Sequence, residues 1–154
     1  MELILWRHAE AEPGEPDLGR GLTGKGEKQA RRMADWLHAH LPQSARILVS
    51  PARRAQQTAQ ALAEVGHRKL KTVEEIGPGA RVADLLAAAD WPDARQPVVI
   101  VGHQPTLGWL VSELLSGSAQ GWSVKKGAVW WLQSRQREGH RQVLLRAVVN
   151  PDLI

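Results

Sequence analysis

The sequence has 154 residues, of which 43% are hydrophobic and 23% charged, and a formal net charge of +4. These proportions are typical of an ordinary globular protein and exclude disordered, coiled-coil and collagen-like chains, while the length fits one domain, residues 1–154. No apolar run approaches the ~18 residues of a membrane span, so we expect no membrane segment and a cytoplasmic location.

The first predicted element is a strand at the N-terminus. Leu3 to Trp6 form a short, unbroken apolar run, which is typical of a strand covered on both faces in a parallel sheet. Pro, Gly and acidic residues between Glu10 and Gly21 predict a loop. Thr23 is a suitable N-cap for the helix that follows, and Pro42 marks its end. The apolar face of this helix comprises Ala30, Met33, Ala34, Leu37 and Leu41.

A second strand and a second helix come next. Ile47 to Val49 predict the strand, which ends at Ser50-Pro51. The helix after it carries Arg53 and Arg54 in its first turn. Its predicted buried side comprises Ala55, Ala59, Leu62 and Val65.

The middle of the chain repeats this alternation. Lys69 to Val73 predict a weaker strand, and Val82 to Ala89 predict a short helix. Val98 to Val101 form the strongest buried strand, which places His103 just beyond its carboxyl end. Pro105 fits the first turn of another helix. The apolar side of that helix comprises Leu107, Leu110, Val111 and Leu114.

The C-terminal part differs, because two strand patterns follow each other directly. Ala128 to Gln133 and Gln142 to Val149 flank a polar turn over Arg135 to Gly139, which predicts an antiparallel hairpin. Together the elements predict an α/β fold: a three-layer sandwich with a mostly parallel central sheet, helices on both faces and this hairpin at the end.

Basic side chains gather at the predicted carboxyl ends of the strands. Arg7-His8, Arg54 and His103 all fall there, where open sheets of this kind bind ligands, and Arg20 lies in the first loop. Singly, each has an ordinary explanation, such as a loop cation, a helix-surface charge or a hydrogen-bonded core histidine. Together they form a cationic cup around an imidazole, which suits a phosphoryl group because guanidinium groups match its oxygens bidentately.

Any covalent nucleophile of such a site is expected to be a group other than a thiolate, and an imidazole lies within the cup. The chain has no cysteine, which removes disulfides, thiolate metal sites and cysteine-based phosphatase chemistry. An imidazole attacks phosphorus only when neutral, and we expect neighbouring guanidinium charges to lower the pKa of His8. Several arginines and a second histidine could neutralise the charge of the transferring group without a metal.

Four motifs carry a resemblance to a known family. Arg7-His8-Ala9-Glu10-Ala11, Asp17 to Gly26, Ser50 to Thr58 and Gly102 to Pro105 together resemble the histidine phosphatase superfamily, and within it the phosphohistidine phosphatases of the SixA type. Ala9 stands where the family usually has Gly, a variation common in the SixA-like branch.

The resemblance implies a phosphoglycerate mutase-like fold and a role for each motif. It implies that His8 is phosphorylated during turnover and that His103 is the second catalytic histidine, which also contacts phosphate. Arg7, Arg20 and Arg54 are implied to bind phosphate, with Arg7 and Arg54 also serving catalysis. The expected activity is hydrolysis of phosphohistidine on a protein, with neither cofactor nor metal, by a monomer that binds neither nucleic acid nor membrane.

A general acid is the uncertain part of the predicted site. Glu74 and Glu75 follow the weak strand, and loop solvation explains them better than catalysis does. A phosphohistidine substrate releases a neutral imidazole when already protonated, so a dedicated acid is less necessary than for alkyl esters. Two alternatives stay open: a small-molecule phosphomonoesterase of the same fold, and a module that binds phosphoproteins without turnover.

Three other signals favour no further function. Gly19 to Gly26 nearly match a P-loop, but Gly26 stands where the magnesium-binding Ser or Thr belongs. His38 and His40 near a helix end have no third ligand at matching spacing. The basic residues are scattered along the chain, which argues against nucleic-acid binding.

Overall fold

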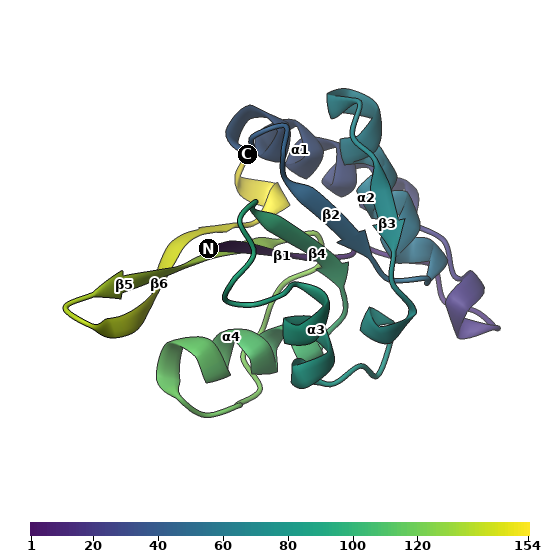
Figure 1. Ribbon diagram of the computed structural model, residues 1–154. Coiled ribbons are helices and arrows are strands. Elements are labelled where there is room, and N and C mark those ends of the chain that lie inside the picture. The colour runs from purple at the N-terminus through teal and green to yellow at the C-terminus, as the bar shows by residue number, and fades with distance from the viewer.

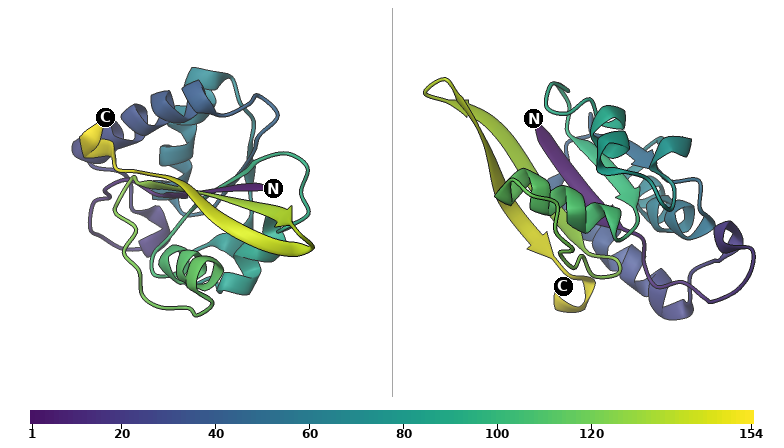
Figure 2. Two further views of the ribbon diagram at one scale, coloured as in Figure 1. Left: turned by 90° about the vertical axis from the view of Figure 1, so that its left-hand side faces the viewer. Right: turned by 90° about the horizontal axis from the view of Figure 1, so that it is seen from below.

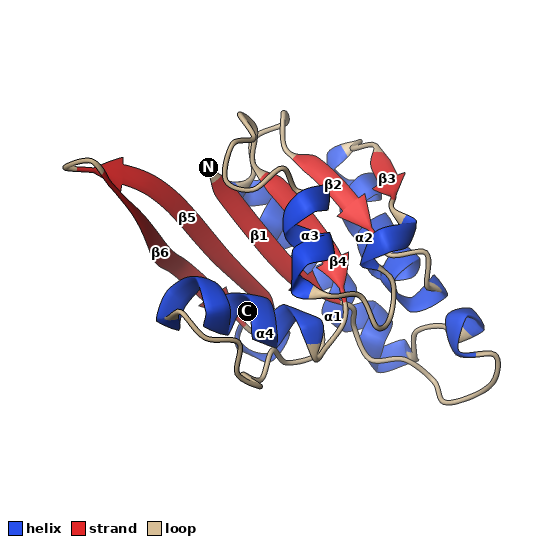
Figure 3. Ribbon diagram, turned by 60° about the horizontal axis from the view of Figure 1, so that its bottom comes forward, coloured by secondary structure: helices blue, strands red, loops and turns tan.

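Six strands pair in the order β3-β2-β4-β1-β5-β6 in the computed structural model, which describes residues 1–154 (Figure 1). The first four strands of this order are parallel, as Figure 3 shows for β2, β3 and β4, whereas β5 runs antiparallel to both β1 and β6. The strand bounds are β1 Glu2–Arg7, β2 Arg46–Val49, β3 Leu70–Thr72, β4 Val98–Gly102, β5 Val129–Arg137 and β6 His140–Val149.

Two pairs of helices cover the two faces of the sheet (Figures 1 and 2). One face packs against α1 (Gly24–His40) and α2 (Arg53–Gly66), and the other against α3 (Val82–Ala88) and α4 (Thr106–Ser116). Short 3-10 helices lie at η1 (Asp17–Gly19), η2 (Glu74–Ile76) and η3 (Pro151–Leu153). The predicted three-layer α/β sandwich is therefore confirmed.

The central strands are apolar throughout because both of their faces are buried. In β1, Ile4 and Trp6 belong to the core under α1 and α2, while Leu3 and Leu5 belong to the core under α3 and α4. All four side chains are fully buried. The apolar run that predicted this strand is unbroken because alternate side chains enter two different cores, one on each face of the sheet.

The C-terminal hairpin is longer and its turn tighter than the sequence predicted. The strands reach Arg137 and His140, so the turn comprises only Glu138 and Gly139 rather than Arg135 to Gly139. Both turn residues have positive φ, at 52° and 78°. Two-residue hairpin turns favour positive φ, because their backbone twist then matches that of the flanking strands. Beyond the core the strands carry polar side chains, so no hydrophobic pattern marks their extension.

The start of α1 is fastened to the loop that follows β1. Thr23 caps the helix as predicted, its hydroxyl accepting from Gly26 N at 2.9 Å. A Cβ on Gly26 would lie 2.0 Å from the carbonyl oxygen of Glu10, so only glycine permits this approach. One smaller expectation was wrong, because Val65, predicted on the buried side of α2, is 37% exposed. No helix has the length and apolar character needed to cross a membrane.

Candidate active site

The register of two parallel strands places His8 beside His103. Arg7 of β1 pairs with Gly102 of β4, so the next residue of each chain segment leaves the sheet at the same point. The backbone is held there too, because His8 N donates to Gly102 O at 3.1 Å. The two imidazole rings lie 5.2 Å apart between centroids, and both side chains are more than nine-tenths buried.

His8 is held as a neutral ring with one nitrogen free. Its Nδ1 lies 2.8 Å from the carbonyl oxygen of Ala9, and because a carbonyl only accepts, Nδ1 carries the proton and Nε2 keeps its lone pair. Burial is the main cause that lowers the pKa of His8 to about 4. Guanidinium charges lower that pKa further, while the Ala9 hydrogen bond acts in the opposite direction. The expected lowering is present, but desolvation contributes more to it than the arginines.

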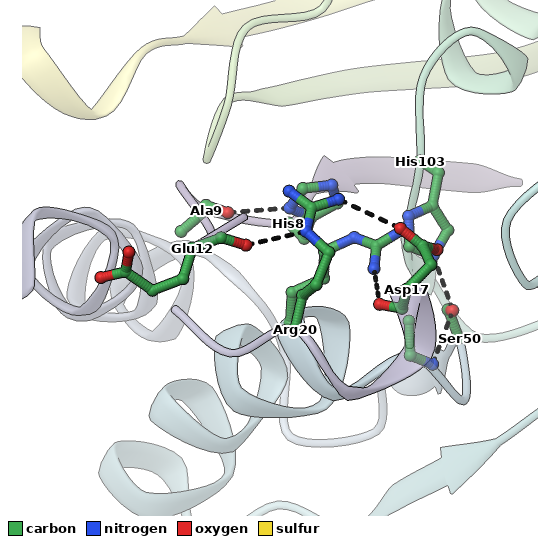
Figure 4. Close-up of polar contacts among 9 residues, drawn as sticks. His8, Ala9, Glu12, Asp17, Arg20, Ser50 and His103 are labelled. Atoms are coloured by element: carbon green, nitrogen blue, oxygen red, sulfur yellow. Dashed lines mark hydrogen bonds and ion pairs between the residues drawn. The ribbon is translucent and has the colours of Figure 1, made fainter. Parts of the chain in front are cut away.

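His103 is anchored by a buried hydroxyl from the neighbouring strand. Its Nε2 lies 2.7 Å from Oγ of Ser50, and the same oxygen accepts from Ala52 N at 3.2 Å (Figure 4). Ser50 is fully buried just after β2, and its amide donates to Val101 O. Burial, then the charges of His8 and Arg54, lower the pKa of His103 to about 3. His103 is therefore also neutral in the unliganded protein.

Arg54 reaches the site from the first turn of α2, as predicted. It is 5% exposed, and the hydroxyl of Thr58, one turn further along, donates to its backbone carbonyl at 2.8 Å. The same hydroxyl accepts from Ala9 N at 3.0 Å, which ties α2 to the segment that holds His8. The N-terminus of α2 has no side-chain cap, so the positive end of the helix dipole is available to an anionic ligand.

Arg7 and Arg20 complete the set of cations around His8. Arg7 is the last residue of β1, and its Nη1 donates to Val124 O at 2.9 Å. Arg20 follows η1 in the first loop, where its Nε donates to the carbonyl oxygen of Glu12 at 2.8 Å. Both charges, like that of Arg54, disfavour the protonated form of His8 and so lower its pKa. The structure thus brings Arg7, His8, Arg20, Arg54 and His103 together.

Asp17 is a member of this cluster that sequence reasoning missed. Its carboxylate accepts from Nη1 of Arg20 and from Nη2 of Arg54, each at 3.1 Å (Figure 4). Its main-chain carbonyl also accepts from Arg54, at 2.9 Å. These hydrogen bonds lower the pKa of Asp17, first through Arg20. The only signal in the sequence was its place at the start of the motif that contains Arg20.

The two predicted acid candidates stand apart from this hydrogen-bonded cluster. Glu74 and Glu75 are exposed on η2, and their carboxylates make no hydrogen bond or ion pair. No three His, Asp or Glu side chains gather anywhere in the chain in a way that would hold a metal ion. The polar groups around His8 and His103 are arginines, backbone carbonyls, the hydroxyl of Ser50 and the carboxylate of Asp17.

Comparison with known proteins agrees with this geometry. The model of the histidine phosphatase superfamily (branch 1) matches residues 3–80. Phosphohistidine phosphatase SixA of Escherichia coli is 33% identical over an alignment of 125 residues, with 76% of each chain covered. A SixA homolog from Haemophilus influenzae is 35% identical over 127 residues, covering 74% of this chain and 77% of its own. The chain therefore belongs to the histidine phosphatase superfamily.

Solved structures extend the likeness over nearly the whole chain. The protein histidine phosphatase SixA complexed with tungstate is 26% identical, with a TM-score of 0.78 and 99% of both chains covered. A putative SixA from Nakamurella multipartitia has a TM-score of 0.80 at 26% identity, covering 97% of this chain and 95% of its own. These matches confirm the predicted phosphoglycerate mutase-like fold with its C-terminal hairpin.

Proposed function

We propose that this protein hydrolyses phosphohistidine on a protein substrate, through a covalent phosphohistidine intermediate on His8. The observation that carries the proposal is a buried, neutral imidazole with a free Nε2, surrounded by three guanidinium charges. Relatives at 33% and 35% identity that are named phosphohistidine phosphatase SixA and SixA homolog support the choice of substrate.

In the first step, Nε2 of His8 attacks the phosphorus. A new N–P bond forms as the P–N bond to the substrate imidazole breaks. The substrate ring is already protonated on its other nitrogen, so it keeps the electron pair of the broken bond and leaves as a neutral imidazole. Arg7, Arg20 and Arg54 would neutralise the oxygens of the group in transfer, which is what phosphoryl transfer needs most. The buried Nε–H groups of Arg7 and Arg54 have no acceptor within the protein, and a bound oxyanion would supply one.

In the second step, water attacks the phosphorus and the N–P bond to His8 breaks. The products are inorganic phosphate and the neutral imidazole with which the cycle began. The dianionic phosphoryl group would raise the pKa of His103, because an adjacent negative charge favours imidazolium. His103 would then donate a hydrogen bond to a phosphoryl oxygen, and a leaving imidazole would not require a carboxylic acid such as Glu74 or Glu75.

The intermediate is tested by trapping it. A protein substrate labelled with ³²P on histidine should transfer acid-labile, alkali-stable label to the wild-type enzyme, and none to the His8→Ala variant. Arg54→Ala should reduce turnover by ~10² to 10³, as loss of one transition-state donor typically does. Acid-labile label that persists on His8→Ala would remove His8 from this role.

The substrate class is tested by comparing rates on a panel. The enzyme should hydrolyse phosphohistidine peptides with a kcat/KM well above that for sugar phosphates and nucleotides. Efficient hydrolysis of sugar phosphates with phosphohistidine peptides left intact would instead indicate a small-molecule phosphomonoesterase. A stable phosphopeptide complex without turnover would indicate a binding module.

A further inference from the structure

A second cationic surface adjoins the candidate active site at Arg7. A hollow of about 380 Å³ lies between the start of α1, the turn before β5 and η3, and it has no hydrophobic lining residue. Figure 2 shows η3 beside α1 at the C-terminal end of the chain. The hollow is lined by Arg7, Lys25, Gln29, Lys125, Lys126 and Asp152, together with Pro151; we call it the lysine hollow.

The lysines of the turn are fastened directly to the segment that carries His8. Gly127 N donates to His8 O at 3.1 Å, and Arg7 N donates to Ala128 O at 3.1 Å. The indole of Trp6 donates to Gly127 O at 3.2 Å, from a fully buried position in β1. The backbone that carries Lys125 and Lys126 is therefore fixed to the segment of the nucleophile rather than free.

Most of the positive charge of the lysine hollow is uncompensated. Lys25 and Lys125 are exposed and form no ion pair, and the one acidic lining residue is Asp152. Lys126 has a distant partner, with its Nζ 4.0 Å from Oε1 of Glu10. Like charges held close together without partners cost stability, so their arrangement favours a ligand with negative groups.

Arg7 belongs to both the candidate active site and the lysine hollow, so a single ligand can contact the two together. Its charge acts on His8, and its side chain also lines the lysine hollow. A ligand with its phosphoryl group at His8 would thus present neighbouring groups to the lysines. The polar lining favours carboxylates on a protein face over apolar side chains.

We propose that the lysine hollow is a docking site for the acidic face of a phosphohistidine protein, with aspartate or glutamate side chains near the phosphorylated residue. This inference rests on the proposed function, since it assigns the surroundings of the same substrate. Carboxylates would pair with Lys25, Lys125 and Lys126 while the phosphoryl group meets His8, which selects protein partners by charge and speeds their association.

The experiment uses two synthetic phosphohistidine peptides of equal length, one flanked by glutamates and the other by glutamines, with phosphoramidate as the small substrate. The wild-type enzyme should prefer the glutamate peptide by ~10-fold or more in kcat/KM at low salt. Lys25→Glu/Lys125→Glu should abolish that preference and leave phosphoramidate hydrolysis unchanged. Lys69→Glu/Lys71→Glu changes the charge equally at exposed positions by the β3 edge of the sheet, and should keep the preference.

A binding arm separates failure of this inference from failure of the proposed function. The unphosphorylated glutamate peptide should bind wild-type protein more tightly than Lys25→Glu/Lys125→Glu in fluorescence anisotropy. Equal binding of this peptide by the two proteins would overturn the docking site. So would an equal loss, in the lysine variant, of activity on the glutamate peptide, the glutamine peptide and phosphoramidate. Absence of hydrolysis of both phosphopeptides and of phosphoramidate would reject the proposed function, and the docking site would then be decided by binding alone.

Discussion

His8 and His103 face each other as two uncharged rings, 5.2 Å apart between centroids and tilted by 51°. The hydrogen-bond partner of each is a neutral group, the carbonyl of Ala9 for one and the hydroxyl of Ser50 for the other. A charge on His8 would also disfavour a charge on His103. The charge of Asp17 acts on His103 in the opposite direction, but no carboxylate is hydrogen-bonded to either ring, so the buried pair stays unprotonated until an anion arrives.

The first prediction is that neither ring takes up a proton at neutral pH. Ring-proton NMR titration should give a pKa of about 4 for His8 and about 3 for His103, because burial penalises both imidazolium forms. The same rings in urea-unfolded protein should titrate near 6.5. Titration of His8 near 6.5 in the folded protein would contradict the buried, neutral nucleophile.

The second prediction follows from the same shifts and concerns stability in acid. Both folded-state pKa values lie below the unfolded value, so the unfolded chain binds these protons first and the free energy of unfolding falls as pH drops from 6.5 towards 4. His8 alone would account for a loss of roughly 3 kcal/mol over that window. Urea denaturation at several pH values measures it.

Replacement of both rings provides the control for acid stability. The His8→Gln/His103→Gln variant should show a flatter pH dependence between 6.5 and 4, since no buried imidazole remains to be protonated on unfolding. An equal slope in wild type and variant would mean that other groups cause the acid sensitivity.

The third prediction concerns Asp17, whose carboxylate occupies donors of Arg20 and Arg54 that an oxyanion would need. Its side chain is 53% exposed, so the ion pairs are weak while their competition with a bound anion is direct. Asp17→Asn should tighten binding of inorganic phosphate or tungstate about two- to fivefold in calorimetry. Asp84→Asn removes a similar exposed pair with Arg81 and should leave the affinity unchanged. Weaker binding to Asp17→Asn would mean that this carboxylate orients the arginines instead.

The contrast between His103 and Asp17 explains what the sequence could predict. Strand ends follow from apolar runs, and parallel strands end at one edge, so His8 and His103 could be placed together without coordinates. Arg54 followed from its place in the first turn of a helix. The path of the loop from Glu10 to Gly21 depends on tertiary contacts, such as the one between Glu10 and Gly26, so nothing local indicated that Asp17 would meet Arg54.

The cause of the His8 pKa shift shows a second limit. Charges can be counted in a sequence, so the effect of the arginines was predictable, whereas the depth at which the His8 ring is buried depends on tertiary packing. The hairpin shows a third limit, because polar strands beyond a core have no hydrophobic alternation. The sequence predicted a turn, but only the backbone shows that it is limited to Glu138 and Gly139.

The fourth prediction assigns Ser50 a positioning role through His103. Ser50→Ala leaves His103 Nε2 and Ala52 N without their partner, which should cost about 1–3 kcal/mol of stability. Turnover should fall ~10-fold or more with little change in KM, because the ring loses its orientation for the phosphoryl group. Ser112→Ala is the matched control, since Ser112 is a buried residue of α4 whose hydroxyl donates to Ser118 O and accepts from Gln120 N. It should lose comparable stability and keep its kcat. Equal loss of kcat in both variants would reduce Ser50 to a purely structural residue, whereas a changed His103 ring-nitrogen shift in Ser50→Ala alone would support its positioning role.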